Sequence, residues 1–277
     1  MPVVHGNLIY YLCLEFHDMV IKTLFEKYFK SLISGLFFVS FLSGISAQEV
    51  SEPKSAGYWI TYSGDHRIND RLGIMSLLSL RNYFLQDRVE QTLARVGLNY
   101  YFNSRTILTA GYGFMYADPD EFVARSDIRE HQIWQQFITR HRTRAIFWEH
   151  RYRLEQRFLT NLSSGTSRLV HRVRYRFQFI LPFYSITPHL RHFFFAANDE
   201  IFLKLNPATT AGVFDRNRIF LALGYQVSPK FNLRLGYLNQ IANSAATPQG
   251  EVNHLVQLGI SYNMEDIMHT FFNRSGK

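Results

Sequence analysis

The chain has 277 residues, enough for one large all-β domain or two small ones, and 16% of them are aromatic. Its 30 Lys and Arg exceed its 22 Asp and Glu, giving a net charge of +8, but the arginines alternate along the sequence and do not cluster. This pattern argues against a nucleic-acid partner. The single cysteine, Cys13, lies in a segment that we expect to be removed, which excludes disulfides and thiolate metal sites from the rest.

The N-terminal region has the pattern of a secretory signal that is cleaved on export. Lys22, Lys27 and Lys30 form a basic region, Leu32–Leu42 is apolar, and a run of small residues ends at Ala47. The apolar run is shorter than the roughly 20 residues that a helix needs to span a bilayer, which argues against a retained transmembrane anchor. We predict an extension ahead of the natural start at 1–18, a signal peptide at 19–47 and a polar leader at 48–56.

Strand-like segments with turn signals between them follow the leader. They span approximately 57–64, 71–83, 90–102, 105–117, 128–141, 143–160, 167–181, 186–205, 216–227, 230–241 and 251–264. Bacterial single-chain barrels have an even number of strands, whereas these segments are odd in number. Either 57–64 is a lumenal or partial strand, which gives 10 strands, or 186–205 is interrupted near Asn198 and Asp199. The second possibility gives 12 strands, the number that we favour.

The stretch Ala145–Phe158 shows most clearly the pattern that recurs along the chain. Read as a strand, it places charged side chains on one face and mainly aromatic or aliphatic ones on the other. Helical spacing would scatter the charges around the axis. The charged face would hold Glu149, Arg151, Arg153, Glu155 and Arg157, and the other would hold Ile146, Trp148, Tyr152, Leu154 and Phe158, with His150 and Gln156 as its polar members.

An antiparallel transmembrane β-barrel explains these segments best. Their outward faces would be rich in Phe, Tyr, Leu and Trp, whereas a β-sandwich would present polar outer faces. Tight connections alternate with longer ones, as in outer-membrane barrels, and closure removes exposed strand edges. The tight connections are 103–105, 142–143, 182–184 and 228–230, and the longer ones are 117–127, 160–166, 206–215 and 242–250. We therefore predict an all-β fold, a barrel of 10–12 strands over 57–272, surrounded by the lipid of a bacterial outer membrane.

Several short stretches together resemble a known family. They are His131–Gln136, His150–Phe158, Asn198–Phe202, Phe214–Tyr225 and Leu235–Gln240. In this order and spacing, over roughly Trp59 to Tyr262, the chain resembles the bacterial outer-membrane barrel family DUF2490. The resemblance implies a barrel fold and an outer-membrane location. It implies no activity and transfers no catalytic residue, because the family has no established activity.

Charged side chains on the inward faces form the candidate site. They are Glu149, Arg151, Arg153, Glu155, Arg157, Arg172, Arg174, Arg176, Asp199, Glu200, Arg216 and Arg218. One interpretation is that these charges pair with one another, fill a narrow barrel and hold the strand register. The other is that the surplus of arginine selects or binds a small anionic solute, as rings of Arg do in pores. The sequence leaves both interpretations open.

No metal site and no cofactor are expected. His189 and His192 would point to opposite faces of a strand, because side chains alternate along it. Gly111 and Gly113 are small inward residues of a strand and form no phosphate loop, since no helix follows them.

The alternative to a non-enzymatic barrel is an outer-membrane lipid-modifying hydrolase. Such an enzyme needs a serine and a histidine close together on one surface. His150, His171 and His254 are available, but their neighbours in the sequence single out no serine. We therefore expect a non-enzymatic protein, either a pore or binding site for a small anionic solute or a structural component of the envelope.

Overall fold

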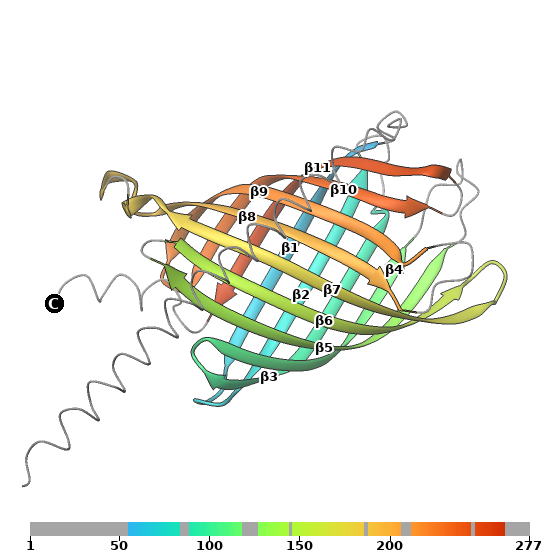
Figure 1. Cartoon of the computed structure of the whole chain (residues 1–277), viewed down its shortest axis with the longest axis horizontal. Coiled ribbons are helices and arrows are strands. Elements are labelled where there is room, and N and C mark those ends of the chain that lie inside the picture. Colours follow the sequence, from blue (N-terminus) through green and yellow to red (C-terminus); the bar gives the residue numbers. More distant parts are fainter. Residues whose placement is uncertain are drawn as a thin grey trace, which may run out of the picture. The chain divides into compact units, whose positions relative to one another are not determined.

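The described part of the chain forms one closed β-barrel (Figure 1). The computed structural model describes residues 55–83, 89–117, 127–143, 146–185, 188–205, 212–244 and 247–263. The strands are β1 Ser55–Arg67, β2 Leu72–Tyr83, β3 Gln91–Asn103, β4 Thr106–Ala117, β5 Ile128–Thr143, β6 Ile146–Asn161, β7 Ser167–Pro182, β8 Phe193–Lys204, β9 Phe214–Ser228, β10 Phe231–Ser244 and β11 Thr247–Asn263. Two short 3-10 turns, η2 Phe183–Ser185 and η3 Pro188–Leu190, connect β7 to β8. A helix both long and apolar enough to cross a membrane does not occur among these residues.

The all-β barrel is confirmed, but the favoured strand number of 12 is wrong, because the described residues form eleven strands. β1 is a complete strand, and β8 runs unbroken through Asn198 and Asp199, which pair with β7 and β9. All neighbouring strands are antiparallel except β1 and β11, which pair in parallel from Ser55↔Asn253 to Asp65↔Asn263. The parallel pair follows from the odd number, since the first and last of eleven alternating strands run in the same direction.

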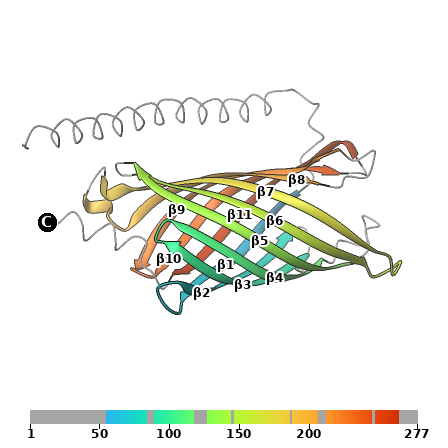
Figure 2. The ribbon, with the colours of Figure 1, turned by 60° about the horizontal axis from the view of Figure 1, so that its bottom comes forward.

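The two ends of the barrel differ in their connections, and both ends are visible in Figure 2. We call one end, with the turns β1–β2, β3–β4, β5–β6 and β9–β10, the short-turn end, and the opposite end the long-loop end. Two predicted connections differ from the structure. The connection between β7 and β8 is longer than expected, because β8 begins only at Phe193, and the one between β10 and β11 is shorter, because those strands extend to Ser244 and from Thr247.

The predictions for the N-terminal region are not addressed by the structure. The extension 1–18, the signal peptide 19–47 and most of the leader 48–56 lie outside the described residues, as does the end of the predicted barrel beyond residue 263. β1 begins at Ser55, inside the predicted leader.

Side chains alternate between an apolar outer face and a buried inner face. In β6, Arg153 and Glu155 are 2% and 0% exposed, whereas Tyr152 and Leu154 are 49% and 36% exposed. Large hydrophobic side chains are exposed in the same way on the outer faces of the other strands, although β7 and β8 each have only one that is strongly exposed, Leu169 and Phe193. An exposed apolar surface of this extent indicates contact with lipid or another apolar partner.

The interior is packed by side chains from all around the barrel. Trp134 of β5 is fully buried and lies over two inward-facing glycines, Gly97 of β3 and Gly111 of β4. A Cβ atom at either glycine would come within 2.7 and 2.5 Å of the indole ring, so only glycine leaves room for it. This packing fixes the position of β5, which carries Glu130 on its inner face beside β6.

Candidate functional site in the charged interior

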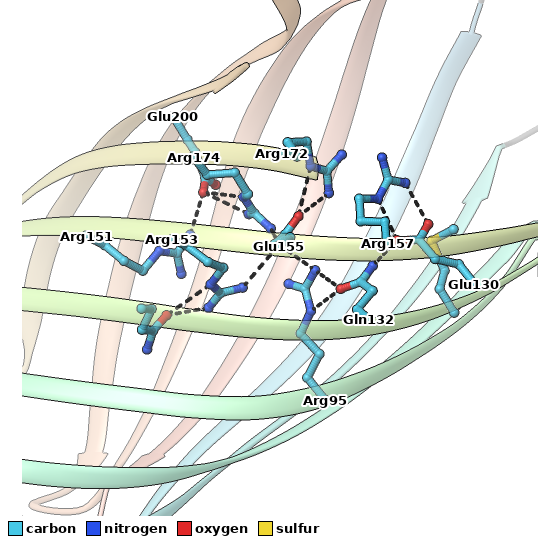
Figure 3. A network of polar contacts seen from close by, with 12 residues as sticks. Arg95, Glu130, Gln132, Arg151, Arg153, Glu155, Arg157, Arg172, Arg174 and Glu200 are labelled. Carbon is cyan, nitrogen blue, oxygen red and sulfur yellow. Dashed lines mark hydrogen bonds and ion pairs between the residues drawn. The ribbon is translucent and has the colours of Figure 1, made fainter. Parts of the chain in front are cut away.

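Glu155 of β6 is the centre of the charged interior (Figure 3). Its carboxylate accepts hydrogen bonds from Arg172 (Nε–Oε2 2.8 Å) and Arg174 (Nη1–Oε1 2.7 Å) of the neighbouring strand β7. Arg95 of β3 also donates to it (Nη2–Oε1 3.0 Å), although β4 and β5 separate β3 from β6 in the wall. Glu155 therefore ties together strands that are not neighbours.

Further carboxylates extend the network from Glu155. Glu200 of β8 accepts from Arg151 at 2.6 Å and from Arg174 at 2.9 Å. Glu130 of β5 holds Arg157 through two bonds of 2.6 Å, which is the bidentate geometry that makes guanidinium–carboxylate pairs strong. On the long-loop side, Asp215 of β9 accepts from Arg172 at 3.0 Å. Each of these carboxylates is occupied by guanidinium groups and offers little to a metal cation.

Two buried arginines are held mainly by amides and aromatic rings. Arg153 donates to Gln136 at 3.1 Å and lies 4.7 Å from the ring centre of Trp134. Arg218 donates to Gln240 at 2.7 Å and lies between the rings of Trp59 and Phe202, 4.8 Å from each centre. Cation–π contacts of this kind stabilise a guanidinium ion without neutralising its charge. The interior therefore keeps a positive surplus.

Phe202 marks the place where the charged and aromatic parts of the interior meet. It is 1% exposed, and four guanidinium groups surround its ring at 4.3–5.7 Å, those of Arg172, Arg174, Arg216 and Arg218. Together with Glu155, Trp134 and Trp59, this ring fills the middle of the barrel.

The structure brings the predicted site residues together on the inner face, with one exception. Asp199 lies on the outer face, opposite Phe177 and Ile219, where Asn217 donates to it at 2.6 Å. The prediction that Asp199 faces the interior is wrong because it directly precedes Glu200, and adjacent residues of a strand point to opposite faces. Arg176, by contrast, faces inward and pairs with Glu149 at 2.5 Å.

Several residues of the network were missed by the sequence analysis. Arg95 alternates with apolar residues in β3 and could have been assigned to the inner face. Glu130 has the same parity as Trp134, so the inward position of that tryptophan would have identified it. Asp215 could not have been found, because an irregularity in the β8–β9 ladder near Phe202 is what buries it beside Arg216.

A serine–histidine contact lies on the outer face, away from this network. The Nε2 atom of His66 in β1 is 3.1 Å from the Oγ atom of Ser76 in β2. A Cβ atom placed on Gly64 would meet both of these atoms and the hydroxyl of Tyr62, so three polar groups converge over a glycine. Two of the histidines considered from the sequence contact tyrosines instead, His150 with Tyr175 and His254 with Tyr237.

Comparison with known proteins identifies the family but no activity. A search of curated proteins finds no match to this chain. Among solved structures, one described as “NanC porin structure in rhombohedral crystal form” is similar, with 13% sequence identity and a TM-score of 0.48. The similarity covers 74% of this chain and 96% of that one. The family described as “Protein of unknown function (DUF2490)” matches residues 56–251, from β1 into β11. The chain belongs to the DUF2490 family.

Proposed function

We propose that this protein is a non-enzymatic outer-membrane barrel whose positively charged interior takes up a small anionic solute. The observation that carries the proposal is the excess of arginines over carboxylates on the inner face of the described strands. The inward arginines include Arg81, Arg95, Arg140, Arg151, Arg153, Arg157, Arg172, Arg174, Arg176, Arg216, Arg218 and Arg234, and the inward carboxylates among the side chains that the structure describes are Asp65, Glu130, Glu149, Glu155, Glu200 and Asp215.

The apolar outer face and polar interior suit a barrel that crosses a membrane, since lipid then covers the exposed Leu, Val, Phe and Tyr side chains. An interior with a surplus of guanidinium groups attracts anions and repels cations. The packing around Glu155 and Phe202 restricts the size of any solute that passes. We therefore infer a narrow, anion-selective path or a binding site, and not a wide channel.

Planar-bilayer recording tests this function. The purified mature chain should give a small conductance whose reversal potential in a salt gradient shows preference for chloride over potassium. Cation preference would contradict the proposal. A bilayer that stays silent, together with no measurable binding of anions to the folded protein, would assign the chain to a structural role in the envelope.

The location is tested separately. Mass spectrometry of the protein from the outer-membrane fraction should show an N-terminus at Gln48, after cleavage behind Ala47. Boiled and unboiled samples should migrate differently on a detergent gel. An intact Met1 or Met19 would contradict the predicted export.

The contact between His66 and Ser76 supports a second candidate, a hydrolase of lipid esters. A serine hydroxyl within hydrogen-bond reach of a histidine is the arrangement that activates a nucleophile. It ranks second for two reasons. Ser76 lies mid-strand with partners on both sides, so its backbone N–H is used by the sheet and is not free to stabilise an oxyanion. The nearby carboxylate of Asp65 does not orient His66, because it faces the interior, where Asn99 donates to it at 2.8 Å. Release of fatty acid from phospholipid vesicles that disappears in Ser76→Ala would establish this candidate.

A further inference from the structure

Three inward arginines have a guanidinium N–H group without a partner. The Nε atoms of Arg151 in β6, Arg176 in β7 and Arg234 in β10 are buried, and none has a hydrogen-bond acceptor among the described residues. A buried donor without an acceptor is costly, by about 1–3 kcal/mol. Their common environment therefore has donors in excess of acceptors.

These arginines lie on the short-turn side of Glu155. Arg151 precedes Glu155 on β6, and Arg176 on β7 is the direct cross-strand neighbour of Arg151. Arg234 lies close to the start of β10. Like charges directly opposite one another in a ladder repel. All three side chains point into the interior of the closed barrel on this side of Glu155, which directs them toward one region. The charges of Arg176 and Glu149 act on Arg234 from the other side of the interior.

The nearby carboxylates are already shared between several arginines. Glu200 accepts from both Arg151 and Arg174, and Glu149 accepts from both Arg140 (2.9 Å) and Arg176 (2.5 Å). Arg234 has no carboxylate of its own among the described residues, and its Nη2 atom donates to the hydroxyl of Ser261 at 2.5 Å. The positive surplus of the interior is therefore concentrated here.

Space adjoins the Nε atom of Arg234. In the ladder Arg234 is opposite Gly259 of β11, and a Cβ atom on that glycine would lie 3.7 Å from Nε, at ordinary contact distance. A methyl group would fit at this position, so the glycine places no side chain over the unpartnered donor. A ligand group that takes this position must supply hydrogen-bond acceptors.

We propose that Arg151, Arg176 and Arg234 form a binding site for a small oxyanion, a phosphate or a carboxylate. Guanidinium groups bind such anions through two parallel N–H donors, one of which is Nε–H. Two oxygen atoms of an oxyanion would therefore accept hydrogen bonds from the Nε–H groups that have no acceptor among the described residues. This inference rests on the proposed function, because it names the class of anion and its place in the interior.

Isothermal titration calorimetry of the folded mature chain in detergent, at constant ionic strength, tests the site with inorganic phosphate and with acetate. Saturable binding of either probe is expected, and the tighter of the two identifies the source of the oxyanion. Arg234→Gln should weaken it roughly tenfold or more, the value of one hydrogen bond to a charged group. Arg105→Gln, which removes the same charge from an exposed turn at the same end, should bind as the unaltered chain does.

Gly259→Val provides a second variant that keeps every charge but fills the space beside Arg234, and it should also weaken binding. Equal weakening in Arg234→Gln and Arg105→Gln, unchanged affinity in Arg234→Gln, or no binding of either probe would overturn the site. If neither probe binds but the bilayer conductance is anion-selective, the site is wrong and the proposed function stands. If both fail, both are wrong.

Discussion

Two parts of the inner surface are built from different side chains. The inner faces of β5–β8, which we call the charged wall, carry the ion pairs around Glu155. The inner faces of β10, β11, β1 and β2, which we call the seam wall because they include the parallel closure, carry small polar residues and glycine around a buried apolar cluster of Trp59, Leu238 and Leu255. Within the described strands, the seam wall therefore holds far fewer ion pairs than the charged wall.

Short hydroxyl side chains connect the strands of the seam wall. Ser63 of β1 and Ser261 of β11 share a hydrogen bond of 3.0 Å, and Thr61 and Ser79 share one of 3.2 Å. These residues hold the seam without filling the interior. Near the short-turn end we therefore expect a solute to travel along these short side chains, past Arg234, and not through the ion pairs of the charged wall. Substitutions in the two walls can test this difference.

Glu155→Ala should have the largest effect on stability. It leaves Arg95, Arg172 and Arg174 without their shared carboxylate in the buried interior. Removal of one partner of a buried ion pair costs about 3–5 kcal/mol, and here several pairs depend on one residue. Denaturant unfolding of the barrel in detergent or lipid measures the loss.

The control for this experiment is Gln156→Ala, the next residue on the same strand but on the outer face. It should lower the free energy of unfolding by only about 1 kcal/mol, because its amide is hydrogen-bonded to one neutral side chain, that of Gln135. If Glu155→Ala were equally mild and increased the preference for anions, the charged wall would line a wet path. The contrast with the seam wall would then disappear.

Glycine substitutions in the two walls should differ in their effect on stability, by less than Glu155→Ala does. Gly111→Ala places a methyl group against the indole of Trp134 and the backbone of β3, and overpacking of this kind costs about 1–3 kcal/mol. Gly259→Ala in the seam wall meets only ordinary contacts with Arg234, so it should leave stability unchanged or raise it slightly. Thermal unfolding of the two variants side by side gives the comparison. Equal losses would mean that the seam wall is as tightly packed as the surroundings of Trp134.

Ser63→Ala should have a still smaller effect, a loss of about 0.5–1.5 kcal/mol from one hydrogen bond across the parallel seam. Thr160→Ala is the matched variant, because Thr160 and Ser167 share the same kind of bond at 3.0 Å between exposed side chains of an antiparallel pair. Since water replaces a bond at an exposed site, Thr160→Ala should cost less. A larger loss in Thr160→Ala would argue against a structural role for the seam hydroxyls.

Much of this architecture was predictable from alternation alone. The segment from Ala145 to Phe158 assigned the side chains of β6 up to Phe158 to their faces, because a period of two is a local property of the chain. The strand spans followed for the same reason, although they differ by several residues at β8 and β11. The parallel closure was not predicted, because the rule that bacterial barrels have an even number of strands was preferred to the eleven segments visible in the sequence.

The candidate site was predictable only in part. Glu155 and its neighbours on β6 and β7 were assigned to one face, but the bond from Arg95 depends on how far β3 lies from β6 around the wall. Such distances depend on the tilt and stagger of the whole barrel, which local patterns do not determine. Asp199 shows the opposite case, since strict alternation with Glu200 already excluded it from the interior.

Single cysteine substitutions should leave stability nearly unaffected at half-buried or exposed positions, lower it at the buried Arg153, and report which wall faces water. The chain after the predicted cleavage site has no cysteine of its own, so there is no background reaction. In reconstituted vesicles, a water-soluble thiol reagent should modify Ser63→Cys in the seam wall but not Arg153→Cys in the charged wall, which is 2% exposed. A lipid-soluble quencher should dim fluorophores attached at Tyr152→Cys and Leu154→Cys on the outer face and at neither inner position. Reaction at both inner positions would mean water around the whole interior, and the path would not be confined to the seam. Quenching with a period of three to four residues along β6 would indicate a helix and contradict the barrel itself.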